Sequence, residues 1–184
     1  MASIADEKLN ARKAAFARRK LAHQSGIDAT ENLVSAIAGL PGEVVAGYWP
    51  IRTEIDPREA LTELSKSRQI VLPVVLGDGQ PLEFRLWAPG AEMIEGAFGA
   101  AIPANTDTLD PDVVIVPLSA YDLRGYRLGY GGGFYDRTLE QLRSIKPMAA
   151  IGFAYSAQQT DSVPIENTDQ PLDGIVTELG YTRF

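Results

Sequence analysis

Short continuous apolar runs alternate along the chain with segments whose apolar residues have helical spacing. Runs of this kind, bounded by turn residues, are typical of strands buried on both faces of a sheet. Strands are expected at 44–49, 70–76, 113–117, 149–155 and 174–178, the last strand of the chain. Helices are expected at 4–24, 29–38, 57–67 and 135–144. This alternation predicts an α/β fold with three layers, a mostly parallel sheet flanked by helices.

Residues 82–87 have a different pattern, because their apolar and polar side chains alternate with a period of two. The turn segment 77–80 precedes them, so an antiparallel hairpin is expected, appended to the parallel core. Residues 88–112 have no clear periodicity and are predicted to form a long loop, which in a compact domain is usually functional or mobile. The length of 184 residues fits a single domain spanning 1–184.

The amino-acid composition limits the kinds of metal site and binding partner that the chain can have. The chain has no cysteine and a single histidine, His23, which excludes disulfides and argues against zinc or iron sites. Any metal is therefore expected to be held by oxygen, which points to magnesium or calcium. The net charge of −7 argues against general nucleic-acid binding. The sequence has neither an apolar run of membrane-spanning length nor a signal-peptide pattern, so a cytoplasmic protein without membrane contact is expected.

The stretch Arg127–Asp136, RLGYGGGFYD, stands out because four of its residues are glycines. Such a turn before a helix directs free backbone N–H groups toward a ligand, and anions bind at these positions. Arg127 and Arg137 flank the turn and are candidates to bind phosphate oxygens. The stretch matches neither the P-loop nor the dinucleotide-binding glycine pattern, and the alternative is an ordinary tight turn between a strand and a helix.

Cations and carboxylates recur elsewhere in the chain. Lys8, Arg12 and Arg19 share one stripe of the first expected helix, either as a phosphate site or as a solvated basic face, the more common explanation. Asp56 has a sufficient structural role as the cap of the helix at 57–67. The other carboxylates near the ends of expected strands are Glu54, Asp122, Asp136 and Asp169. Phosphoryl transfer needs both charge types, so these residues favour a magnesium- and nucleotide-dependent enzyme over a hydrolase.

The full glycine stretch resembles the signature of the 5-formyltetrahydrofolate cyclo-ligases, also called 5,10-methenyltetrahydrofolate synthetases. The resemblance extends in the right order over Lys8 to Arg12, Tyr48 to Glu54, residues 112–117, residues 151–154 and residues 169–178. It implies an α/β sheet sandwiched by helices. It also implies an enzyme that uses ATP and Mg²⁺ to convert 5-formyltetrahydrofolate to 5,10-methenyltetrahydrofolate, with release of ADP and phosphate.

The resemblance also implies roles for individual residues. ATP as co-substrate would bind Lys8, Arg12, Arg127, Leu128, Gly129, Tyr130, Gly131, Gly132, Gly133, Phe134 and Tyr135, of which Arg127 and Tyr135 would be catalytic. The folate would contact Trp49, Glu54, Tyr130, Gly131, Gly132, Gly133 and Phe134. Asp136 and Asp169 would bind Mg²⁺. A monomer is expected, with 5-formyltetrahydrofolate and ATP as its partners.

Three positions depart from the family pattern. Phe134 stands where tyrosine is common, Ile102 where an acidic residue is usual, and Thr168 where a histidine often precedes the second metal aspartate. Two alternatives therefore stay open: a non-catalytic folate- or nucleotide-binding protein of the same fold, and another ATP-dependent ligase that acts on a small acid.

Overall fold

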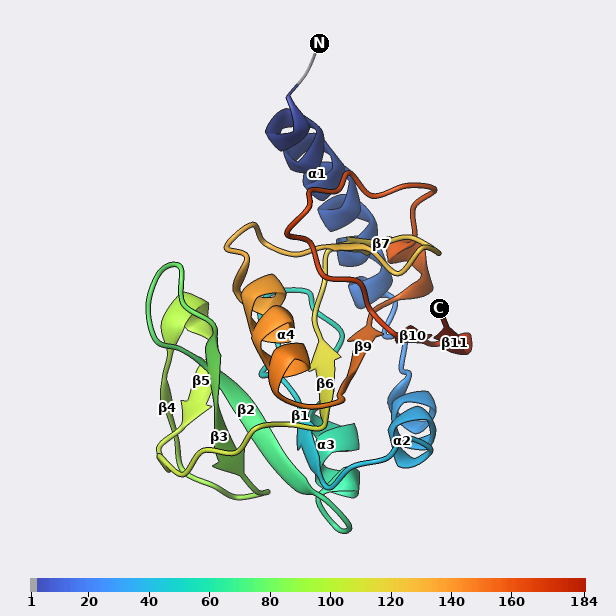
Figure 1. The fold of residues 1–184 in the computed structure, drawn as a ribbon. Coiled ribbons are helices and arrows are strands. Elements are labelled where there is room, and N and C mark those ends of the chain that lie inside the picture. Colours follow the sequence, from blue (N-terminus) through green and yellow to red (C-terminus); the bar gives the residue numbers. More distant parts are fainter. Residues whose placement is uncertain (1–2) are drawn as a thin grey trace.

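A seven-stranded sheet forms the centre of the protein in the computed structural model, which describes residues 3–184 (Figure 1). Its strands, in spatial order, are β11 (Gly180–Arg183), β10 (Gly174–Thr177), β9 (Ala149–Phe153), β6 (Val113–Val116), β1 (Val44–Ala46), β2 (Gln69–Val75) and β3 (Leu82–Trp87). The five inner strands are parallel, and β3 and β11 pair antiparallel at the edges. The mostly parallel sheet with its appended hairpin is confirmed.

Helices cover both faces of this sheet. On one face, α2 (Thr30–Ala38), α3 (Arg58–Leu64) and the C-terminal part of α1 (Ile4–Gln24) share a core with alternate strand residues. On the other, α4 (Phe134–Ile145) packs through Leu139 and Leu142. Every residue of β6 is buried, as its continuous apolar run predicts. The result is the predicted three-layer α/β fold.

The order of the strands creates a crevice at the carboxyl end of the sheet. The chain begins in the middle at β1, runs outward through α3 to β2, and later returns to place β6 on the other side of β1. The neighbours β1 and β6 are parallel, but the chain leaves β1 toward one edge of the sheet and leaves β6 toward the other. In open α/β sheets this switch point is where ligands bind.

Two expectations about the chain need correction. Residues 88–112 are not a plain loop, because β4 (Met93–Glu95) and β5 (Ala101–Pro103) form a hairpin around the 3₁₀ turn Ala97–Gly99. The strand at 174–178 is not the last, since β11 follows it. Between β6 and the glycine turn the chain forms a two-stranded ribbon of β7 (Ala120–Tyr121) and β8 (Arg127–Leu128), and β8 is the start of the glycine stretch.

One expectation about a helix start also changes. Pro57, not Asp56, precedes the first residue of α3, and Asp56 instead accepts a hydrogen bond from the Arg58 backbone N–H at 2.9 Å. Ser3 caps α1 by exchanging hydrogen bonds with Asp6.

Among residues 3–184, no helix combines the length and the apolar character that crossing a bilayer requires.

Candidate functional site

A pocket of about 850 Å³ opens at the switch point of the sheet. Its size falls within the range of about 300–1,000 Å³ that ligand pockets have. Segments after β1 and β6, the N-terminus of α4, part of α1 and the β4–β5 hairpin line it. The structure brings together here every residue predicted for the site: Lys8, Arg12, Trp49, Glu54, Arg127, Leu128, Gly129, Tyr130, Gly131, Gly132, Gly133, Phe134, Tyr135, Asp136 and Asp169.

The glycine turn has the backbone that the sequence predicts. Gly131 and Gly133 have φ values of 105° and 66°, in the region that residues with a Cβ rarely adopt. Gly133 precedes α4, and no side chain caps the first N–H groups of that helix. Arg12 lies directly on the turn, since its Nε donates to the Gly129 carbonyl oxygen at 2.8 Å. Uncapped N–H groups beside a guanidinium form a local anion site in a protein of net negative charge.

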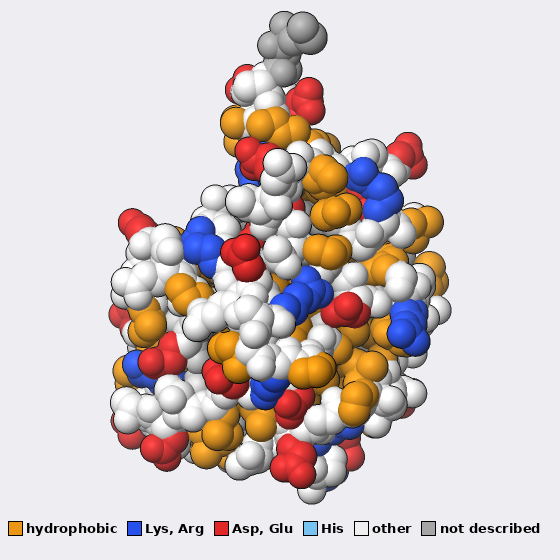
Figure 2. Space-filling model, in the orientation of Figure 1, with side chains coloured by type: hydrophobic (Ala, Val, Ile, Leu, Met, Phe, Trp, Pro, Cys, Tyr) orange, Lys and Arg blue, Asp and Glu red, His pale blue; other side chains and the backbone are white. Residues whose placement is uncertain are grey.

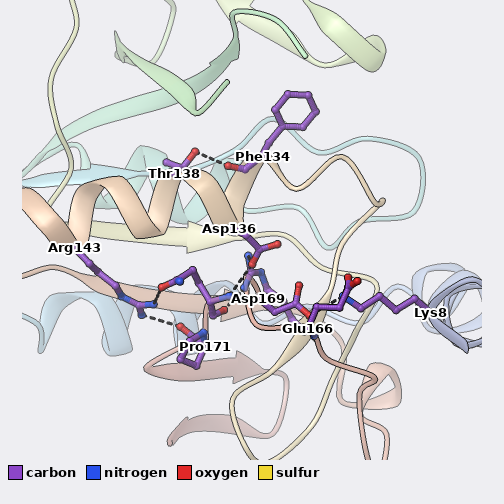
Figure 3. A network of polar contacts seen from close by, with 10 residues as sticks. Lys8, Phe134, Asp136, Thr138, Arg143, Glu166, Asp169 and Pro171 are labelled. Carbon is purple, nitrogen blue, oxygen red and sulfur yellow. Dashed lines mark hydrogen bonds and ion pairs between the residues drawn. The ribbon is translucent and has the colours of Figure 1, made fainter. Parts of the chain in front are cut away.

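The basic stripe of α1 is not a solvated face. Lys8 is 8% exposed, and its Nζ pairs with Glu166 at 2.8 Å and Asp169 at 2.7 Å (Figure 3). Burial alone would lower the pKa of the Lys8 ammonium, but the two carboxylates outweigh it and raise the pKa. Figure 2 shows acidic and basic side chains interspersed over one face of the molecule.

Arg19, on the same stripe, is 1% exposed. Its Nε donates to Thr53 Oγ1 at 3.0 Å and one terminal nitrogen donates to the Tyr130 hydroxyl at 2.9 Å. The guanidinium also lies 5.0 Å from the ring centroid of Phe16, which stacks on Tyr130. Arg19 therefore connects α1, the segment after β1 and the glycine turn.

Glu54 lies in the segment after β1 and is 5% exposed. The chain turns tightly there: the Glu54 N–H donates to the Ile51 carbonyl oxygen, and Glu54 Oε2 accepts the Ile51 N–H at 2.9 Å. Burial raises the pKa of the Glu54 carboxyl, while that hydrogen bond and the charges of Arg19 and Arg52 partly oppose the rise. A buried acceptor at the wall of a pocket is suited to bind the N–H groups of a ligand.

The two predicted metal ligands are tied to each other through one loop. Asp136 Oδ1 accepts hydrogen bonds from Arg127 and from the Gln170 N–H, both at 2.9 Å. Asp169, the residue before Gln170, accepts a hydrogen bond from Lys8 Nζ through its Oδ2. Among residues 3–184, the second oxygen of each carboxylate accepts no hydrogen bond, and no cluster of three metal-binding side chains is found. Hard carboxylate oxygens of this kind fit Mg²⁺, which usually takes one or two protein carboxylates and keeps several waters.

One further carboxylate and two aromatic residues were singled out in the sequence. Asp122 is buried and holds a loop, because it pairs with Arg124 at 2.6 Å and accepts the Val163 N–H at 2.8 Å. Its role is structural, and it does not line the pocket. Trp49 packs edge-on against Trp87 with ring centroids 6.5 Å apart. Burial raises the pKa of the Tyr135 hydroxyl well above its ordinary value, so this residue stays protonated.

Arg52 and Phe98 are among the residues of the pocket wall that sequence reasoning missed. Both have positive φ values, 54° and 59°, although neither is glycine. Phe98 is 70% exposed at the tip between β4 and β5, and its ring centroid lies 6.0 Å from that of Phe134. No sequence pattern predicts a positive φ at arginine or phenylalanine. The hairpin that carries Phe98 was not predicted, because residues 88–112 show no periodicity.

Comparison with known proteins identifies relatives of the chain. The model of the 5-formyltetrahydrofolate cyclo-ligase family matches residues 3–178. The 5-formyltetrahydrofolate cyclo-ligase of Escherichia coli K12 is 47% identical over 142 residues, covering 72% of this chain and 76% of the relative. That of Haemophilus influenzae is 32% identical over 161 residues, covering 84% and 86%.

The fold agrees with this similarity. The NMR structure of 5,10-methenyltetrahydrofolate synthetase from Aquifex aeolicus matches with a TM-score of 0.75 at 30% identity. The match covers 96% of this chain and 92% of the other. Sequence and structure thus point to the same set of relatives.

Proposed function

The chain belongs to the 5-formyltetrahydrofolate cyclo-ligase family, and from this premise we propose that it converts 5-formyltetrahydrofolate to 5,10-methenyltetrahydrofolate with ATP as co-substrate. ADP and phosphate are the other products. A cytoplasmic location and a monomeric state stay predictions.

The chemistry explains why such a reaction needs ATP. The formyl group of the substrate is an amide, and its nitrogen donates into the carbonyl, so its carbon is a poor electrophile. Transfer of the γ-phosphoryl group to the formyl oxygen breaks the bond between that phosphorus and ADP and creates a phosphate leaving group. N10 then attacks the formyl carbon, the bond from carbon to the phosphorylated oxygen breaks, and N10 loses its proton.

The phosphate side of the pocket is assigned to cations and to free backbone donors. Lys8, Arg12 and the N–H groups of the turn 129–133 bind the ATP phosphates in this proposal, and Arg127 stabilises the charge that develops on the transferred group. Tyr135 stays protonated and donates a hydrogen bond. Asp136 and Asp169 would hold Mg²⁺, which neutralises phosphate charge when bound.

The folate side is assigned to the segment after β1. Glu54 accepts hydrogen bonds from the donor edge of the pterin, Trp49 supplies a flat apolar wall, and Tyr130 to Phe134 line the opposite side. Holding the folate here places N10 and the formyl group within reach of each other, so the second step needs no further encounter.

One observation supports this function best: the anion site at Arg12 and the glycine turn shares a single pocket with the buried acceptor Glu54. The test is the absorbance of methenyltetrahydrofolate formed from 5-formyltetrahydrofolate, with ATP or Mg²⁺ omitted in turn. We expect product only when both are present. Tight folate binding without turnover would contradict the proposal and favour a non-catalytic binding protein.

A further inference from the structure

Arg52 differs from Lys8 and Arg12 because its backbone is strained and its guanidinium, within the described part of the chain, is held by no hydrogen bond or ion pair. Its φ of 54° is costly for a residue with a Cβ, and strain of this kind is often found at functional sites. Among residues 3–184, the guanidinium makes no hydrogen bond or ion pair and lies over the ring of Tyr130, with Cζ 5.7 Å from the centroid. Lys8 and Arg12, in contrast, already bind Asp169 and Gly129.

The side chain of Arg52 is not what holds this conformation. The turn is closed by the two hydrogen bonds between Ile51 and Glu54, and the buried Arg19 anchors it through Thr53. The turn that places Glu54 thus requires a left-handed residue at position 52, which glycine would supply without strain. An arginine here costs stability, so its side chain calls for a role in the pocket.

The position of Arg52 suggests that role. It lies between Trp49 and Glu54 in sequence, on the proposed folate side, and rests on Tyr130 of the glycine turn. Arg12 approaches the same turn from α1, where its guanidinium carbon lies 3.4 Å from where a Cβ on Gly131 would be. Arg12 therefore meets Gly129 and Gly131, and Arg52 meets Tyr130 between them, from different elements.

We propose that Arg52 is a further catalytic residue, whose guanidinium binds the oxygens of the phosphoryl group as that group passes from the nucleotide to the formyl oxygen. This inference rests on the proposed function. The bond from phosphorus to ADP breaks with its electron pair going to ADP, the bond from phosphorus to the formyl oxygen forms, and Arg52 keeps its proton throughout. Arginine suits the task because its planar fork binds two phosphoryl oxygens at once and stays charged.

The test compares Arg52→Gly and Arg52→Lys with the wild type and with Arg183→Gln, which removes an exposed cation from β11, outside the pocket. We expect kcat of Arg52→Gly to fall roughly ten- to a hundredfold, with both KM values within about threefold of wild type. Its Tm should equal or exceed that of the wild type, because strain is relieved. Added guanidinium ion should restore part of its activity, Arg52→Lys should retain more, and Arg183→Gln should match the wild type.

Other results would overturn the inference. An unchanged kcat, or a rise in one KM alone, would remove Arg52 from phosphoryl transfer, and the affected KM would show whether it binds only nucleotide or only folate. A lower Tm or an unfolded Arg52→Gly would give the side chain a structural role instead. An inactive wild type would contradict the proposed function and this inference with it, whereas an active wild type with an equally active Arg52→Gly would contradict the inference alone.

Discussion

Single side chains of the pocket carry charge that burial makes costly. Lys8 and Glu54 are each less than a tenth exposed. The two carboxylates paired with Lys8 outweigh the effect of burial on its pKa, whereas the partners of Glu54 offset only part of that effect. Arg12 differs, because one of its nitrogens binds the turn while the guanidinium still faces the pocket. Such residues are expected to contribute more to ligand binding than to stability.

For Arg12→Ala we expect weaker ATP binding in a folded protein. Loss of a charge-assisted phosphate contact costs on the order of 1.5–3 kcal/mol, or roughly ten- to a hundredfold in affinity. The Michaelis constant for ATP measures this, with the constant for folate as the internal control. An unaltered constant for ATP would remove Arg12 from the phosphate site.

For Glu54→Gln we expect opposite effects on function and stability. The amide loses the charge that binds the pterin donors, so folate affinity falls roughly tenfold or more while ATP affinity stays near wild type. Equal loss of both affinities would mean that Glu54 supports the whole pocket.

The stability effect of Glu54→Gln depends on pH. Burial raises the pKa of Glu54 in the folded protein above that in the unfolded chain, so between the two values the native state binds more protons. The unfolding free energy of the wild type therefore falls as pH rises through that window. We expect Glu54→Gln to be the more stable protein at pH 7, with the advantage lost on acidification below the pKa of the unfolded carboxyl. Denaturation at several pH values would test this, and a pH-independent difference would contradict it.

At the scale of elements, the segment between η2 (Ser156–Gln158) and β10 joins the two ends of the site. It pairs with Lys8 of α1 through Asp169 and with Asp136 of α4 through the Gln170 N–H (Figure 3). Gly133 precedes α4 and Asp136 lies in the first turn of that helix, where a negative charge is favourable. Asp136 is not the cap of the helix, and it pairs with the buried Arg127.

For Asp136→Asn we therefore expect a measurable loss of stability. The amide oxygen can still accept the Gln170 N–H, but Arg127 loses its counter-charge, which costs on the order of 1–3 kcal/mol. Turnover should also fall and recover partly at high Mg²⁺, because an amide is a poorer ligand for that ion.

A matched control separates these two effects of Asp136→Asn. Asp173 bridges in a similar way, since it pairs with Arg143 and accepts the Ala150 N–H at 2.7 Å, but it lies outside the pocket. Asp173→Asn should lose stability without any dependence of its activity on Mg²⁺. Full activity of Asp136→Asn at limiting Mg²⁺ would remove Asp136 from the metal site.

For the whole molecule, the mostly parallel sheet could be predicted, because continuous apolar runs identify its buried strands. The order of these strands, which places the switch point, does not follow from the runs. The β4–β5 hairpin and β11 could not be predicted, since they are short and half exposed and leave no clear pattern. The burial of Arg19 could not be predicted from the sequence either. A stripe of cations has the same sequence pattern whether it faces solvent or is covered by a loop. The residues that cover Arg19, Thr53 and Tyr130, are distant from it in the sequence.

Isotope transfer would show whether ATP activates the formyl oxygen of the substrate. 5-Formyltetrahydrofolate labelled with ¹⁸O in the formyl group would be converted with unlabelled ATP, and the released phosphate analysed by mass spectrometry. The phosphorylation mechanism predicts that this oxygen appears in phosphate, with one ADP formed for each methenyltetrahydrofolate. Unlabelled phosphate, or product formed without ADP, would contradict it.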